Sequence, residues 1–222
     1  IYTALRREFF GVDTEKFSPE GRVPADFPWT GSQRSSMVVF GTVGRLDPVK
    51  NQRALLEAFA GLNRHRKVDA PEARLAIVGG GPLLAELQDQ ARQLGIADKV
   101  WLPGPRDDIA DTLRAIDVFV LPSINEGISN TLLEAMATAR PVIAGAVGGN
   151  VEIVRPGETG HLYAPSDPTA LANAMAGYLE SPALRASQGQ DARRHVRDKF
   201  SIEAMINGYV SFYDSVISGR WH

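Results

Sequence analysis

NEGISNTLLEAMATARPVIA (residues 125–144) joins a polar, glycine-containing turn to a run of apolar residues. The turn leads into a predicted helix that begins near Ser129 or Asn130, and the stretch ends in a predicted buried strand over residues 141–146. A helix that connects a turn to a buried strand is the repeating unit of a parallel sheet with crossover helices. The stretch therefore favours an α/β fold.

The same alternation extends over most of the chain. Strands are predicted over residues 37–46, 73–81, 99–104, 117–123 and 141–146, with a short one near 160–164. Helices are predicted over residues 51–62, 82–95, 107–116, 168–180, 182–198 and 201–218, and Ser181-Pro182 is typical of a helix start. We expect a single Rossmann-like domain, whose parallel sheet is covered by helices on both faces.

Three segments are expected along the chain. Residues 1–36 are rich in Pro, Gly and Ser and are predicted to form an irregular linker. Residues 37–200 form the predicted Rossmann-like domain, and residues 201–222 form a C-terminal helix. The chain begins at Ile1 rather than Met, which suggests a piece of a longer protein.

The composition excludes several classes of function. The chain has 222 residues, of which 44% are hydrophobic and 23% charged, and its net charge of −2 indicates no nucleic-acid partner. The absence of cysteine excludes disulfides and thiolate catalysis and fits a cytoplasmic location. The four histidines are scattered, so no metal site is predicted.

A predicted loop at residues 41–51, GTVGRLDPVKN, carries two cations beside a glycine. Gly44 permits a ligand to approach the backbone, Arg45 can grip a phosphate through its forked guanidinium, and Lys50 adds a point charge. These residues resemble a diphosphate clamp. The alternative is a tight turn with two solvated cations.

Two further loops follow predicted strands. VGGGP (78–82) is either a supporting wall of a site or a compact strand-to-helix turn. LPGPRDD (102–108) could offer backbone groups to a base edge, and Arg106 could stack on that base or stay in solvent. In parallel sheets ligands bind beyond the carboxyl ends of the strands, where both loops are expected.

The stretch at residues 125–144 carries the richest set of groups. Backbone N–H groups at the start of a helix are unpaired and favour an anion. Glu126 and Glu134 lie on either side of that position, where they could accept hydrogen bonds from hydroxyls, as in a nucleotide sugar. In the alternative, Thr131 and Glu134 form a capping box and Glu126 favours the helix dipole.

Five stretches together resemble the C-terminal, donor-binding domain of family-four retaining glycosyltransferases (glycosyl transferases group 1), which have the GT-B fold. They are GVDTEKF (11–17), GRLDPVKN (44–51), VGGGP (78–82), EGISNTLLEAMATARPVIA (126–144) and GGNVEIV (148–154). The resemblance implies a transferase that uses a UDP- or GDP-sugar and needs neither a cofactor nor a catalytic metal.

The resemblance also implies roles for individual residues. Arg45 and Lys50 would hold the diphosphate and stabilise the leaving group, while Glu126 would bind hydroxyls of the donor sugar. Glu134 would take the ribose hydroxyls, and the loop around Pro103–Arg106 would hold the base. The distal phosphate would meet the backbone amides of Gly127, Ile128, Ser129 and Asn130.

A second, N-terminal domain would supply most of the acceptor site in such an enzyme. We therefore expect this chain alone to bind donor weakly and transfer little. The helix at residues 201–218 would cross to that domain, leaving Ile206, Tyr209, Val210, Phe212 and Tyr213 partly exposed. Peripheral membrane association would be possible only through the missing domain.

The implied acceptor is a glycan or lipid-linked sugar in bacterial cell-envelope or exopolysaccharide synthesis. A rival hypothesis is a nucleotide-binding or regulatory module of GT-B type without transfer activity.

Overall fold

The computed structural model describes residues 10–167 and 169–218. Its centre is a six-stranded sheet in the order β3-β2-β1-β4-β5-β6, in which all neighbouring strands are parallel. The strands are β1 Met37–Val43, β2 Glu72–Val78, β3 Val100–Gly104, β4 Val118–Leu121, β5 Val142–Gly145 and β6 Gly160–Tyr163. This Rossmann order confirms the predicted fold, and its switch point between β1 and β4 is where such sheets bind ligands.

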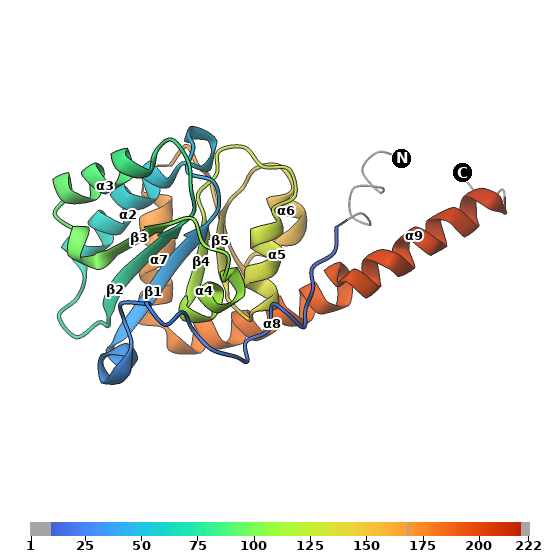
Figure 1. Ribbon diagram of the computed structural model, residues 1–222, viewed down its shortest axis with the longest axis horizontal. Coiled ribbons are helices and arrows are strands. Elements are labelled where there is room, and N and C mark those ends of the chain that lie inside the picture. Colours follow the sequence, from blue (N-terminus) through green and yellow to red (C-terminus); the bar gives the residue numbers. More distant parts are fainter. Residues whose placement is uncertain (1–9, 168, 219–222) are drawn as a thin grey trace.

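Helices cover both faces of the sheet (Figure 1). One face carries α2 Gln52–His65, α3 Leu84–Gln93 and α7 Ala170–Glu180. The other carries α4 Ile109–Ala115, α5 Asn130–Ala137, α6 Asn150–Ile153 and α8 Pro182–Phe200. Successive β1 residues serve the two cores in turn: Val38 and Phe40 face the first group of helices, and Val39 faces the second. The continuous apolar run of β1 follows from this burial on both faces.

Apart from β3, which ends at Gly104 as predicted, the predicted strands extended too far at their carboxyl ends. β1 ends at Val43 and β2 at Val78, three residues before the predicted ends. The residues beyond them form loops that bond to each other, since Leu46 N donates to Gly80 O at 2.9 Å. The candidate site residues at the end of β1 therefore lie in a loop at the switch point.

The N-terminal segment is largely irregular, as predicted. Residues 10–30 contain no helix and no strand, although Val12 forms an isolated bridge with Ser201. The prediction missed a 3₁₀ helix at Gly31–Ser36, in which serine hydroxyls donate to backbone carbonyls within the turn. The rest of the predicted linker, residues 1–9, lies outside the described residues. Two other 3₁₀ helices are Pro48–Lys50 and Ala97–Lys99.

The C-terminal helices begin at serine caps. Ser181 Oγ accepts from Leu184 N at the start of α8, with Pro182 in the first turn, which confirms the predicted helix start. Ser201 Oγ accepts from Ala204 N at the start of α9, Ile202–Ile217. Val12 joins the two helices: its N donates to Phe200 O, and its O accepts from Ile202 N.

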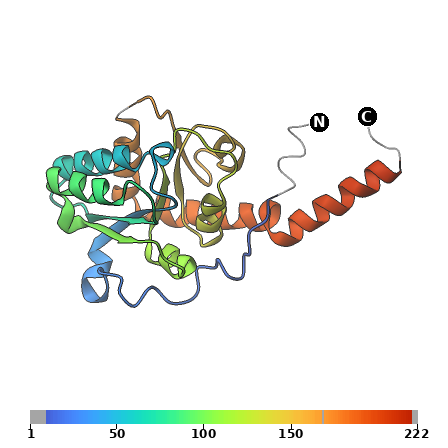
Figure 2. The same ribbon diagram turned by 45° about the horizontal axis from the view of Figure 1, so that its top comes forward.

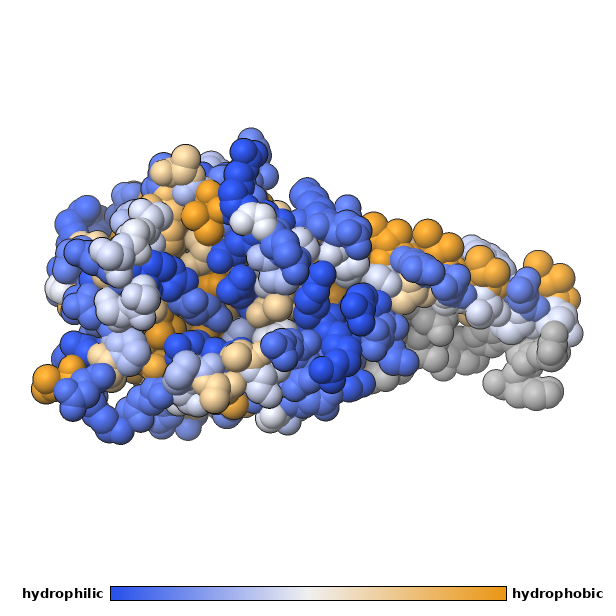
Figure 3. Space-filling model, turned by 90° about the horizontal axis from the view of Figure 1, so that it is seen from below, coloured by the Kyte–Doolittle hydropathy of each residue, from blue (hydrophilic) through white to orange (hydrophobic). Residues whose placement is uncertain are grey.

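Helix α9 runs away from the body of the domain (Figure 1 and Figure 2). None of its described residues is buried. Apolar side chains line it at helical spacing (Figure 3), and the exposed ones include Ile202, Ile206, Val210, Tyr213 and Ile217. The predicted partial exposure of this helix is confirmed. No helix in the described part of the chain combines the length and apolar character needed to cross a bilayer.

Candidate functional site

Lys50 and Glu126 lie together at the switch point of the sheet. Lys50 Nζ contacts Glu126 Oε2 at 2.8 Å and Oε1 at 3.0 Å, and the Glu126 side chain is only 10% exposed. Beside them, Ile124 N donates to Val49 O at 3.0 Å, which ties the loop after β4 to the loop after β1. Two residues that were predicted to share a site are thus in direct contact.

Arg45, the second predicted cation, is held by an acid that the sequence analysis did not single out. Asp47 Oδ2 accepts from Arg45 Nε at 2.6 Å, while Asp47 Oδ1 accepts from the amides of Val49 and Lys50 at 3.1 and 3.3 Å. Burial acts to raise the pKa of Asp47, but these hydrogen bonds outweigh it, so the pKa lies below its usual value. An Asp directly before a Pro is typical of a helix start, and this signal could have revealed the role of Asp47 in the turn at Pro48.

Helix α5 begins with a cap other than the capping box of Thr131 and Glu134 that was the alternative for this stretch. Ser129 is the N-cap, and its Oγ accepts from Leu132 N at 3.4 Å. A capping box between Thr131 and Glu134 is therefore wrong, because both residues lie inside the helix. Glu134 is left without a local capping role.

Four consecutive amides precede and open α5. Within the described part of the chain, no acceptor is found for the amide N–H groups of residues 127–130. Unpaired N–H groups at the positive end of a helix dipole form a site for an anion. Gly127, Ile128, Ser129 and Asn130 therefore offer the groups that the sequence analysis predicted for a phosphate.

Glu134 lies one turn further into α5. Its side chain is partly buried, and burial raises the pKa of its carboxyl group to about 7, an effect that Lys16 partly opposes. No hydrogen bond to this carboxyl group occurs among the described residues. Glu134 has unused acceptor capacity, but no contact joins it to Lys50 or Arg45 in this structure.

Glycines in the loops after neighbouring strands pack against the loop of Gly44 and against the loop of Glu126. A Cβ at Gly79 would lie 1.9 Å from Gly44 O, and one at Gly148 would lie 1.7 Å from Glu126 O. Gly149 N also donates to Gly127 O at 2.8 Å. The stretch at 78–82 is thus a wall behind the loop of Gly44, and residues 148–149 have the same relation to Glu126 and Gly127. The close approach of two backbones explains why glycine stands there.

Arg106 makes contacts that oppose its predicted role at the base. Its guanidinium donates to both carboxylate oxygens of Asp26 at 2.7 and 2.9 Å, and to both of Asp108 at 2.7 Å. These hydrogen bonds, Asp108 first and then Asp26, raise the pKa of Arg106. The group also lies over the ring of Trp101, 5.2 Å from its centroid. With its N–H groups and one face engaged, Arg106 fastens the N-terminal segment to the loop after β3.

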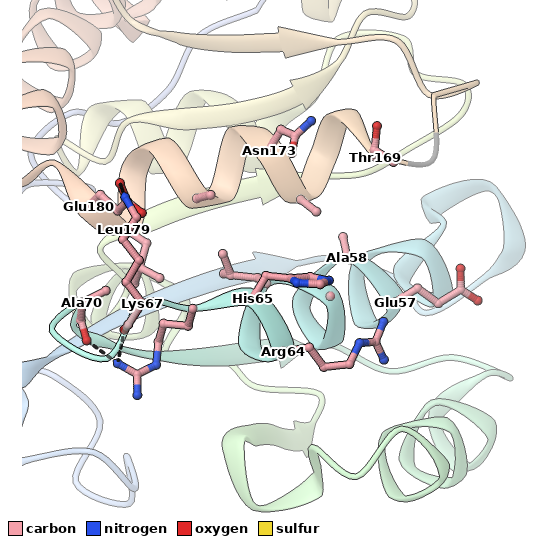
Figure 4. Close-up of a pocket in the computed structure, with 15 residues that line it drawn as sticks. Glu57, Ala58, Arg64, His65, Lys67, Ala70, Thr169, Asn173, Leu179 and Glu180 are labelled. Carbon is pink, nitrogen blue, oxygen red and sulfur yellow. Dashed lines mark hydrogen bonds and ion pairs between the residues drawn. The ribbon is translucent and has the colours of Figure 1, made fainter.

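A separate hollow lies between α2 and α7 and has a volume of about 350 Å³. Its lining includes Glu57, Asn173 and the ion pair of Lys67 with Glu180, but none of the predicted donor-site residues (Figure 4). No cluster of three or more His, Cys, Asp or Glu that could hold a metal was found in residues 10–167 and 169–218. The expectation that no metal is used stays a prediction.

The fold matches that of the C-terminal domains of GT-B glycosyltransferases. Residues 32–195 match the family described as glycosyl transferases group 1, and the chain belongs to this family.

Known relatives agree with this assignment. The chain is 37% identical over 193 residues to D-inositol 3-phosphate glycosyltransferase of Streptomyces avermitilis, a match that covers 83% of this chain and 41% of that protein. It thus spans less than half of that relative's length.

Two solved structures share the fold. One is HepE of Anabaena in complex with UDP, with a TM-score of 0.76 and 24% identity over 92% of this chain and 56% of that one. The other is the C-terminal domain of a glycosyl transferase group 1 family protein (LpcC) from Francisella tularensis. Its TM-score is 0.69, with 25% identity over 86% of this chain and 100% of that one.

Proposed function

We propose that this chain is the donor-binding half of a retaining glycosyltransferase. The enzyme takes a sugar from a UDP- or GDP-sugar and transfers it to a glycan or lipid-linked acceptor of the bacterial cell envelope or an exopolysaccharide. One observation carries the proposal: the amides of residues 127–130, which have no acceptor among the described residues, lie directly after Glu126, whose carboxylate is paired with Lys50. Backbone amides able to bind an anion, a cation and a carboxylate able to accept from hydroxyls thus occur at a single switch point.

The diphosphate of the donor is assigned to the start of α5. The amides there donate hydrogen bonds to the distal phosphate, and Lys50 and Arg45 provide positive charge beside it. Bond cleavage leaves negative charge on the departing diphosphate, so groups already placed around that charge lower the barrier. No metal ion is assigned to this step in the proposal.

The two glutamates are assigned to hydroxyl groups rather than to proton transfer. A carboxylate is an acceptor for hydroxyl hydrogens, and it would repel a phosphate that it contacted directly. Glu126, beside Lys50, takes the donor sugar, and Glu134 takes the ribose. The unused acceptor capacity of Glu134 supports the second assignment.

A second, N-terminal domain belongs to the proposal. The exposed apolar stripe of α9 supports it, because contiguous exposed apolar surface is typical of an interface. The second domain is also supported by the match to the Streptomyces avermitilis glycosyltransferase, which covers less than half of that protein. We propose that this domain supplies the acceptor site, so that the present chain binds the nucleotide but transfers little.

Calorimetric titration with UDP, GDP and ADP tests the nucleotide part of the proposal. We expect binding of at least one nucleotide, and loss of about 10- to 100-fold in affinity for Arg45→Ala, the scale of a charge-assisted hydrogen bond. Arg92→Ala is the matched control, since Arg92 pairs with Asp89 on the surface of α3. If no nucleoside diphosphate binds at millimolar concentration, the proposal fails.

The ribose assignment has its own test. The chain should bind UDP more tightly than 2′-deoxy-UDP by about 5- to 10-fold. Without the 2′-hydroxyl, the Glu134 carboxylate loses a hydrogen-bond donor. In Glu134→Ala this preference should vanish. A preference that survives the substitution would remove Glu134 from the ribose site.

A further inference from the structure

Asp47 connects both candidate cations. One oxygen of its carboxylate accepts from Arg45, and the other accepts from the amide of Lys50 and that of Val49. Its side chain is buried, whereas the side chain of Arg45 is 75% exposed. A buried anion thus holds an exposed cation and the turn that carries the second cation.

A capping role alone does not account for this arrangement. The turn Pro48–Lys50 needs a single acceptor oxygen, which Ser, Thr or Asn could supply as well as Asp. Among the described residues, the second oxygen, Oδ2, is paired with Arg45 alone, through both Nε and Nη2. The negative charge of Asp47 is therefore used for the guanidinium and is not required by the turn.

We propose that Asp47 is a positioning residue that holds Arg45 and the backbone at Lys50 in one arrangement for an incoming diphosphate. This inference rests on the proposed function. An exposed Arg side chain has many rotamers, and ordering it on binding costs entropy. Two N–H groups held by a fixed carboxylate order the side chain beforehand, and Nη1 has no partner in the described part of the chain.

The negative charge of Asp47 also acts against an anion nearby. The geometry favours the ordering effect, because the carboxylate is buried among its donors while the guanidinium extends into solvent. Gln52 fixes the same loop from its other end, since its Nε2 donates to Arg45 O at 3.0 Å. The backbone of Arg45 is thereby held independently of Asp47, so at Arg45 the loss of the carboxylate frees the side chain and not the backbone.

The test measures affinity for UDP, with GDP as a second probe, in Asp47→Asn, which keeps a capping oxygen but loses the charge. We expect affinity to fall about 5- to 10-fold, as for loss of a charge-assisted contact. In an Arg45→Ala background the same substitution should change affinity by less than about twofold, because coupled residues are not additive. Asp47→Ser serves as a second variant with a capping hydroxyl in case Asp47→Asn does not fold.

A second readout needs no ligand. The Arg45 Nε–H signal in ¹⁵N NMR should exchange slowly with water in the parent chain and become fast in Asp47→Asn. The inference would be overturned if Asp47→Asn left UDP binding unchanged or made it tighter. It would also be overturned if Asp47→Asn caused an equal loss in the Arg45→Ala background, or if exchange of the Arg45 Nε–H were unaltered. If the parent chain binds neither UDP nor GDP, the proposed function fails and the inference falls with it. If the parent chain binds UDP and Asp47→Asn binds it equally well, the inference fails while the proposed function stands.

Discussion

Lys50 Nζ lies 2.8 Å from Glu126 Oε2, although 76 residues separate the two in the chain. The pair bridges the loops after β1 and β4, which meet where the strand order reverses. The two charges compensate each other. A diphosphate at the start of α5 would therefore compete with Glu126 for Lys50.

The two partners of this pair should affect nucleotide binding in opposite directions. Lys50→Ala removes a cation from the diphosphate and should weaken UDP binding about 10- to 100-fold. Glu126→Gln removes a competing negative charge and should tighten UDP binding about threefold, since the pair is partly buried and poorly screened. Calorimetry at low and high salt checks both signs. Weaker UDP binding by Glu126→Gln would contradict the assignment of this acid to the sugar.

Glu134 should make the stability of the chain depend on pH. Its pKa is about 7 in the folded state against about 4.5 for the ordinary group, so the folded state holds the proton more tightly. Stability should therefore be full below about pH 4.5 and fall as the pH rises to 7. Urea unfolding of Glu134→Gln should lack this slope and show higher stability than the parent at pH 8. Glu203→Gln, at an exposed position on α9, is the control, and a slope that persists in Glu134→Gln would rule out Glu134 as its source.

Gly148 should tolerate no side chain, because a Cβ would meet the carbonyl of Glu126 at 1.7 Å. Gly148→Ala should cost about 2–4 kcal/mol of unfolding free energy and weaken UDP binding, since the loop of Glu126 must move. Gly157→Ala is the matched control: it also has a positive φ, of 82°, but open space around it. It should cost only about 1 kcal/mol of backbone strain. Equal effects of both substitutions would show that the close approach is unimportant.

Arg106 should act on the N-terminal segment and leave the choice of base unchanged. Arg106→Ala breaks the pairs with Asp26 and Asp108, so the midpoint of thermal unfolding should fall by about 4 °C. Hydrogen exchange around Asp26 and Phe27 should accelerate, and Asp26→Asn should reproduce this effect more weakly. Relative affinities for UDP, GDP and ADP should stay the same. A changed preference among these nucleotides would restore the predicted contact of Arg106 with the base.

The sheet and the location of the candidate site could be predicted from local pattern. Apolar runs such as β1 are long enough to mark strands buried on both faces, and the alternation of strands and helices implies parallel pairing. Strand ends were less accurate, because Leu46 and Gly80 bond across two loops that are distant in sequence. A local pattern carries no information on such a partner.

The candidate site shows the same division. Lys50, Glu126 and the start of α5 were predicted as one group, and the structure brings Lys50 and Glu126 into contact. The role of Asp47 was missed, because its importance comes from the direction of the Arg45 side chain. The contact of Arg106 with Asp26 was not predicted for a related reason, since it depends on how the N-terminal segment folds back, whereas Asp108 lies only two residues along the chain.

Residue order was sufficient for the class of fold and for the edge of the sheet where a ligand would bind. Periodicity and helix-start chemistry act over a few residues, and parallel strands place all their carboxyl ends at one edge. Tertiary structure alone decided which charges are paired. The Lys50–Glu126 and Arg106–Asp26 contacts and the close approach of Gly148 to Glu126 join segments that are far apart in the chain or lie in loops after different strands. Their energies depend on distances and burial that exist only once the sheet has formed.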